Sequence, residues 1–164
     1  KTINDSILHH LDLVDQKDIQ FIWQTGKYYN KQITEELKGK LPSNLIVTDF
    51  ISDMGAAYTA ADLVISRAGA SSISEFCLIG KPVILVPSPN VAEDHQTKNA
   101  MALVNKQAAI YVKDSDAPDC LLEQAIKLIK DDDKLKNLSE NILKLALPDS
   151  ADIIAKEVIK MIRK

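Results

Sequence analysis

Little in this sequence points to a secreted, membrane-spanning or nucleic-acid-binding protein. The chain has only two cysteines, Cys77 and Cys120, far apart and outside any CxxC pattern, so we expect free thiols in a reducing compartment and neither a disulfide framework nor a zinc site. No apolar run approaches the roughly eighteen residues that cross a bilayer, and no signal-peptide core is present. The net charge of -3, without a basic stripe or interleaved aromatic and arginine residues, gives no support for nucleic-acid binding.

The remaining composition is that of one ordinary globular domain. The 164 residues are 46% hydrophobic and 26% charged, which is enough to build a core. The chain opens at Lys1, without a methionine, directly into a helical pattern. Because a natural α/β domain usually starts with a strand, we expect residues 1–164 to be a single domain cut from a longer protein.

Short apolar runs alternate with longer segments whose apolar residues recur at helical spacing. Such alternation predicts an α/β fold: a Rossmann-like parallel sheet with helices on both faces. The predicted strands are residues 19–24, 45–48, 63–66, 83–86 and 109–112. The predicted helices are residues 2–14, 29–38, 53–61, 70–79, 94–106, 118–130, 134–146 and 151–163.

The polar, non-periodic clusters all follow predicted strands. They are residues 25–27, 49–53, 67–71 and 87–96. Ligands of open parallel sheets gather at the carboxyl ends of the strands, so these turns predict a binding edge. The acidic run 131–133 lies elsewhere and is read as a solvated turn between helices rather than a metal site.

The segment from Asp62 to Glu75 carries the strongest single signal. A strand runs into a turn at Gly69, and the helix that follows begins with small and hydroxyl residues. The unpaired amides and dipole of such a helix end favour a phosphate. Glu75 lies one turn beyond Ser71, where its carboxylate could accept hydrogen bonds from a ribose diol. The alternative is an ordinary turn, with glycine for backbone freedom, serine for capping and Glu75 solvated.

A second polar cluster begins the helix predicted near Asp94. His95 and Gln96 fall in its first turn and face the same edge as Gly69. The Gln96 amide both donates and accepts, which suits sugar hydroxyls, and the helix dipole favours a neutral His95. A polar helix start without any ligand is the alternative.

Five segments, in order along nearly the whole chain, resemble the C-terminal half of the MurG family of bacterial UDP-N-acetylglucosamine transferases. They are residues 23–27, 51–54, 67–75, 80–82 and 93–100. The resemblance implies the donor-binding half of a GT-B glycosyltransferase, an enzyme that makes lipid II from lipid I in peptidoglycan synthesis. It further implies that the backbone of Ile51 reads uracil and that Met54 packs beside the base.

The resemblance also implies how the rest of the donor is held. Amides of Gly69, Ala70 and Ser71 would face the diphosphate, and Glu75 would bind the ribose hydroxyls. His95 and Gln96 would contact the N-acetylglucosamine, with His95 the more variable position of the two in the family.

The same resemblance limits what this chain does alone. UDP-GlcNAc is the donor substrate, and no cofactor or metal is implied. The acceptor lipid I, the catalytic base and any membrane contact belong to an N-terminal domain that is not present. A glycine-rich loop that contacts the diphosphate in the family would come just before Lys1. The enzyme would be peripheral at the cytoplasmic face of the plasma membrane, with consequences for cell shape and division. The fragment alone is expected to be inactive.

Two other functions remain open. The chain could be a stand-alone UDP-sugar-binding subunit that needs a partner chain, or part of a GT-B UDP-sugar epimerase. The last predicted helix has an apolar stripe at Ile154, Val158, Met161 and Ile162. This stripe predicts either a helix that covers the core or one that crosses to another domain.

Overall fold

A computed structural model describes residues 1–15 and 18–162. Its strands are β1 (Phe21–Gln24), β2 (Leu45–Thr48), β3 (Val64–Ser66), β4 (Val83–Leu85) and β5 (Ile110–Tyr111). Every strand pair is parallel, which confirms the predicted α/β class. Among the described residues, however, the strands form two sheets, β1-β2 and β3-β4-β5. No ladder hydrogen bond joins β1 to β3 among these residues.

The helices follow the predicted order with some changed bounds. They are α1 (Thr2–His9), α2 (Leu11–Val14), α3 (Lys27–Glu36), α4 (Met54–Ala60), α5 (Ala70–Ile79), α6 (His95–Val104), α7 (Ala117–Ile129), α8 (Asp132–Leu143) and α9 (Ser150–Ile162), with a 3-10 turn η1 at Ala92–Asp94. The helix predicted over 2–14 breaks at His10, whose backbone leaves the helical region at φ -127° and ψ 41°. The reason is tertiary, because the His10 ring bonds the Pro118 carbonyl oxygen at 3.0 Å.

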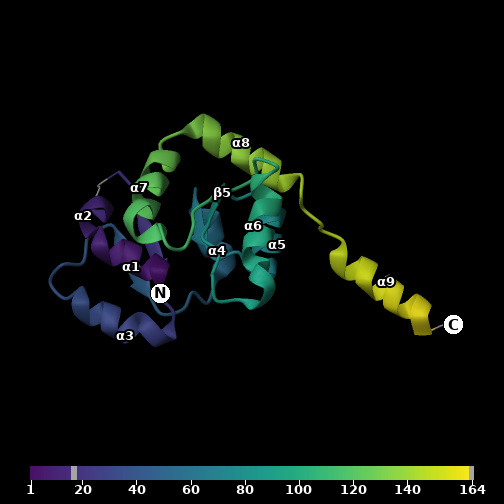
Figure 1. Cartoon of the computed structure of the whole chain (residues 1–164), viewed down its shortest axis with the longest axis horizontal. Coiled ribbons are helices and arrows are strands. Elements are labelled where there is room, and N and C mark those ends of the chain that lie inside the picture. The colour runs from purple at the N-terminus through teal and green to yellow at the C-terminus, as the bar shows by residue number, and fades with distance from the viewer. Residues whose placement is uncertain (16–17, 163–164) are drawn as a thin grey trace.

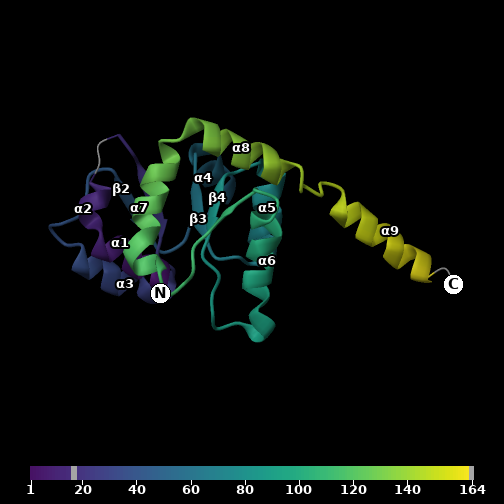
Figure 2. The ribbon, with the colours of Figure 1, turned by 45° about the horizontal axis from the view of Figure 1, so that its top comes forward.

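The β3-β4-β5 sheet lies between two groups of helices. In both ribbon views α1 runs beside α7, and α5 and α6 lie together on the opposite side, with α8 running across between the two groups (Figures 1 and 2). Phe76 of α5 packs with Val83 and Leu85 of β4, whereas Ile84 faces the other way and packs with Leu121 of α7. Alternate residues of β4 are thus buried on both faces, as the continuous apolar run predicts.

The last helix stands apart from this body. Figures 1 and 2 show α9 extending away from the other elements, and all its described residues are exposed. Val158 is 49% exposed and Ile154 63% exposed, so the stripe does not cover the core and that alternative is wrong. Residue 163, the predicted end of the helix, lies outside the described residues. No helix in the described part of the chain is long and apolar enough to span a membrane.

Candidate functional site

The exits of neighbouring strands are tied together at the carboxyl edge. The Thr25 amide after β1 donates to Thr48 at the end of β2, at 2.9 Å. After β3, Arg67 Nη1 donates to the carbonyl oxygens of Val86 and Pro87 at 3.0 and 3.3 Å and pairs with Asp114 beyond β5. These bonds fix the strand-to-helix turns in which the predicted site residues lie.

The N-terminus of α5 is open. Gly69 is its N-cap residue, and within the described residues no side chain caps this end. The backbone of Gly69 is ordinary for any residue, at φ -68° and ψ 142°. A Cβ added there would meet only Ser72 Oγ, at 3.8 Å. Within the described residues, neither backbone freedom nor packing requires this glycine, and no serine side chain caps the helix. Two features of the ordinary-turn interpretation are thus absent, whereas Glu75 is exposed as that interpretation expects.

The turn before α5 is anchored from α6. Asn99 Nδ2 donates to the Ala68 carbonyl oxygen at 3.2 Å. Because the C=O and N–H of a trans peptide point in opposite directions, this bond also fixes the direction of the Gly69 amide. Asn99 therefore contributes to the geometry of the helix end without lying at it.

Glu75 is exposed on α5 and contacts α4. The Tyr58 hydroxyl donates to Glu75 Oε2 at 3.1 Å, and the Tyr58 ring meets Phe76 edge-on, with centroids 5.6 Å apart. Burial, followed by the hydrogen bond to Glu75 and the negative charge of Glu75, raises the pKa of Tyr58 to about 12. The phenol therefore stays protonated and remains a donor to the carboxylate.

His95 and Gln96 are oriented by backbone groups. His95 is the first residue of α6, one later than predicted, because Asp94 and Glu93 adopt left-handed conformations at φ 52° and 53°. His95 Nδ1 lies 2.8 Å from the Ala92 carbonyl oxygen, so Nδ1 carries a proton and, in the neutral ring, Nε2 is left as an acceptor. Gln96 Oε1 accepts from the Ser88 amide at 2.9 Å, so the Nε2 amide group is the donor of this side chain.

Ile51 and Met54 lie at the exit of β2. Met54 is the first residue of α4, whose N-cap Asp53 accepts from the Ala56 amide at 2.8 Å. The Ile51 amide donates to Gln24 Oε1 at 2.8 Å. The Ile51 N–H thus already has a partner within the chain, so the Ile51 carbonyl oxygen is the backbone group of this residue that remains a candidate for reading a base edge. The assignment of this peptide to uracil stays a prediction.

The structure links the predicted residues through side chains to which sequence reasoning assigned no role. Tyr58, Arg67 and Asn99 lie within or beside the polar clusters, yet their partners are 17 to 47 residues away. In the sequence, Tyr58 could have been linked to the site by its spacing from Met54, because residues i and i+4 lie on the same face of a helix.

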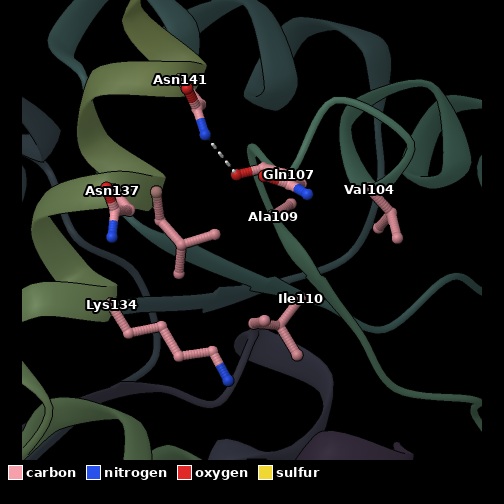
Figure 3. Close-up of a pocket in the computed structure, with 8 residues that line it drawn as sticks. Val104, Gln107, Ala109, Ile110, Lys134, Asn137 and Asn141 are labelled. Carbon is pink, nitrogen blue, oxygen red and sulfur yellow. Dashed lines mark hydrogen bonds between the residues drawn. The ribbon is translucent and has the colours of Figure 1, made fainter.

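One hollow in the described part of the chain lies away from these residues. A cavity of about 470 Å³ opens where the end of α6 and the start of β5 meet α8, and Lys134, Asn137 and Asn141 line it (Figure 3). Asn141 Nδ2 donates to the Gln107 carbonyl oxygen across it at 3.1 Å. This is the amino end of β5, opposite the carboxyl edge, and no predicted site residue lines the cavity.

Parallel strands, helices on both sides and an uncapped helix start at the carboxyl edge define a Rossmann-like α/β domain. The model of the glycosyltransferase family 28 C-terminal domain matches residues 1–154, and the chain belongs to that family. A protein of Bacteroides thetaiotaomicron named UDP-N-acetylglucosamine--N-acetylmuramyl-(pentapeptide) pyrophosphoryl-undecaprenol N-acetylglucosamine transferase is 68% identical over 98% of this chain and 44% of its own length. The chain thus spans less than half the length of the curated relatives it matches.

Solved structures agree with this assignment. MurG of Acinetobacter baumannii superposes with a TM-score of 0.77 at 27% identity, over 94% of this chain and 48% of that one. The glycosyltransferase VinC in complex with DTDP shares the fold, with a TM-score of 0.66 at 19% identity over 84% of this chain and 32% of its own. The predicted resemblance is confirmed, and the fold is that of part of a GT-B glycosyltransferase.

Proposed function

We propose that this chain is the donor-binding half of an inverting glycosyltransferase that moves GlcNAc from UDP-GlcNAc to lipid I. The names of two curated relatives that are 68% and 67% identical to this chain support a transferase over an epimerase or a separate binding subunit. The acceptor site and the catalytic base would belong to the other half, which would also make any contact with the inner face of the plasma membrane. UDP-GlcNAc is the donor substrate, and the proposal requires no cofactor.

One observation carries the donor site more than any other: the open end of α5 beside Glu75. The amides of Gly69, Ala70 and Ser71 would hold the diphosphate, and the carboxylate would take the ribose diol. Gly69 fits this role because its missing side chain leaves free space where a phosphate would approach the backbone.

The sugar and base positions complete the proposal. His95 Nε2 would accept from one sugar hydroxyl, and Gln96 Nε2 would donate to another. Met54 would pack against uracil, and the Ile51 carbonyl oxygen would accept from the base N–H, because the Ile51 amide is bonded to Gln24.

The chemical contribution of this half would be electrostatic. Negative charge grows on the diphosphate as the bond from the sugar to the diphosphate breaks. Amides and a helix dipole fixed before the reaction would stabilise that charge more in the transition state than in the ground state. The acceptor C4 hydroxyl of the muramoyl unit would attack from the opposite face, with inversion at the anomeric carbon.

A ligand-observed NMR titration with UDP-GlcNAc, UDP-GalNAc, UDP and ADP tests the donor site. We expect uridine-selective binding that Glu75→Ala weakens by about 1.5–3 kcal/mol, the range for hydrogen bonds to a charged group. Glu123→Ala, an exposed glutamate on α7, serves as the matched control and should leave binding unchanged. Equal affinity for ADP and UDP would contradict the nucleotide assignment, and unchanged UDP affinity in Glu75→Ala would contradict the ribose assignment.

A further inference from the structure

The bond between Tyr58 and Glu75 joins two helices at the proposed ribose site. Tyr58 comes from α4 and Glu75 from α5, and the hydroxyl and Oε2 are 3.1 Å apart. Phe76, 1% exposed, contacts the Tyr58 ring edge-on. The position of the phenol is therefore fixed by packing as well as by the hydrogen bond to Glu75. An exposed glutamate therefore rests against a tyrosine that the core holds in place.

Without this bond, the Glu75 side chain would not be ordered before the ribose binds. Its side chain has several rotamers, and ordering a long polar side chain costs about 0.5–1.5 kcal/mol on binding. A bond that selects one rotamer beforehand removes part of this cost.

The hydrogen-bonding capacity of the carboxylate leaves room for both partners. An ionised carboxylate has about four acceptor positions on its two oxygens. Tyr58 takes one on Oε2, and a ribose diol needs two. The tyrosine therefore does not compete with the sugar, and its O–H, kept protonated at neutral pH, acts only on the orientation of Glu75.

The position of Tyr58 on α4 also connects ribose with base. Met54 lies four residues earlier and is half-buried like Tyr58, so both side chains share one face of α4. A single helix would thus contact the base through Met54 and orient the ribose ligand through Tyr58.

We propose that Tyr58 is a positioning residue for donor recognition: it holds Glu75 in the rotamer that receives the ribose 2′ and 3′ hydroxyls. This inference rests on the proposed function, because it takes Glu75 as the ribose ligand. Tyr58 would then contribute to the preference for ribose over deoxyribose and would not contribute to phosphate binding.

The test compares Tyr58→Phe with the unaltered chain in affinity for UDP and for 2′-deoxyuridine diphosphate. Phenylalanine keeps the ring contact with Phe76 and removes only the hydroxyl. We expect UDP affinity to fall between about two- and tenfold, the size of one hydrogen bond, while deoxy-ligand affinity changes less. Tyr111→Phe on β5 is the matched control and should leave the ratio of the two affinities unchanged.

A double variant separates positioning from stability. In the Glu75→Ala background, Tyr58→Phe should leave the affinity ratio where Glu75→Ala alone put it. A proportional loss for both ligands, together with a lower melting temperature, would assign Tyr58 a structural role and overturn the inference.

The outcomes distinguish the two proposals. If Glu75→Ala lowers the ratio and Tyr58→Phe does not, only the role of Tyr58 is refuted. If Glu75→Ala also leaves the ratio unchanged, the ribose assignment falls with it. If the unaltered chain binds neither nucleotide, both proposals fail.

Discussion

Replacing Gly69 by alanine should separate donor binding from stability. At φ -68° and ψ 142° the new residue fits without strain, and its Cβ would meet only Ser72 Oγ at 3.8 Å. Alanine is a poorer N-cap than glycine, which costs roughly 0.5–1 kcal/mol, whereas the stiffer unfolded chain returns about 0.4–1 kcal/mol. The free energy of unfolding should therefore change by less than about 1 kcal/mol, a shift of at most about 4 °C in Tm for a domain of this size.

Binding should respond far more strongly. A methyl group in the open space before α5 would keep a phosphate from the helix amides. The loss of even one charge-assisted bond costs about 1.5–3 kcal/mol, or roughly 10- to 150-fold in affinity. NMR titrations with UDP and with uridine measure this as a lost preference for UDP, because uridine carries no phosphate.

Gly55→Ala is the matched control for this experiment. It adds the same methyl group to the first turn of α4, where the nearest neighbour is Asp53 Oδ1 at 3.4 Å. It should stabilise the chain by up to about 1 kcal/mol and leave the UDP-to-uridine preference intact. If Gly69→Ala kept that preference while folding normally, the diphosphate would not lie at the start of α5 and the reasoning would be refuted.

Three further predictions concern buried or half-buried side chains. Trp23→Phe removes the donor that bonds Asn4 Oδ1 at 3.0 Å. The free energy of unfolding, measured in urea titrations, should fall by about 1–3 kcal/mol, and an unchanged midpoint would contradict this. Burial raises the pKa of the Cys77 thiol, which is 5% exposed, so a thiol reagent should label Cys120 first and Cys77 only after denaturation. The pKa of Tyr58, raised from 10.0 to about 12, means that its contribution to stability is complete below pH 10 and is lost as the pH rises toward 12. The phenolate absorbance of Tyr58→Phe should lack this last ionisation, and an identical titration in both proteins would count against it.

Local sequence patterns predicted the bounds of helices and strands well where those bounds depend on neighbouring residues alone. The predicted bounds of β2 (45–48) and α5 (70–79) match the structure, because an apolar run between turn residues and a helix ended by Gly80 are local signals. The helix over 2–14 was wrong because His10 binds a carbonyl on α7, 108 residues away. A single sequence contains no record of that contact.

The candidate site, too, was predictable from the sequence only in part. The residue types at the strand exits predicted which side chains lie at the carboxyl edge. The hydrogen bonds that orient them run from the Ile51 amide to Gln24 Oε1 and from the Tyr58 hydroxyl to Glu75 Oε2. They join residues 27 and 17 positions apart and follow from the packing of whole elements. The apolar stripe of α9 was ambiguous for a related reason, because amphipathicity shows that a helix face is apolar and does not identify what covers it.

Amide chemical shifts of this chain during titration with UDP-GlcNAc test the central claim most directly. The account predicts that the largest changes fall on residues 69–72, with smaller ones at Glu75, His95 and Gln96. Changes confined to the cavity beside α8, at Gln107, Lys134 and Asn141, would place the nucleotide at the opposite edge and contradict the account.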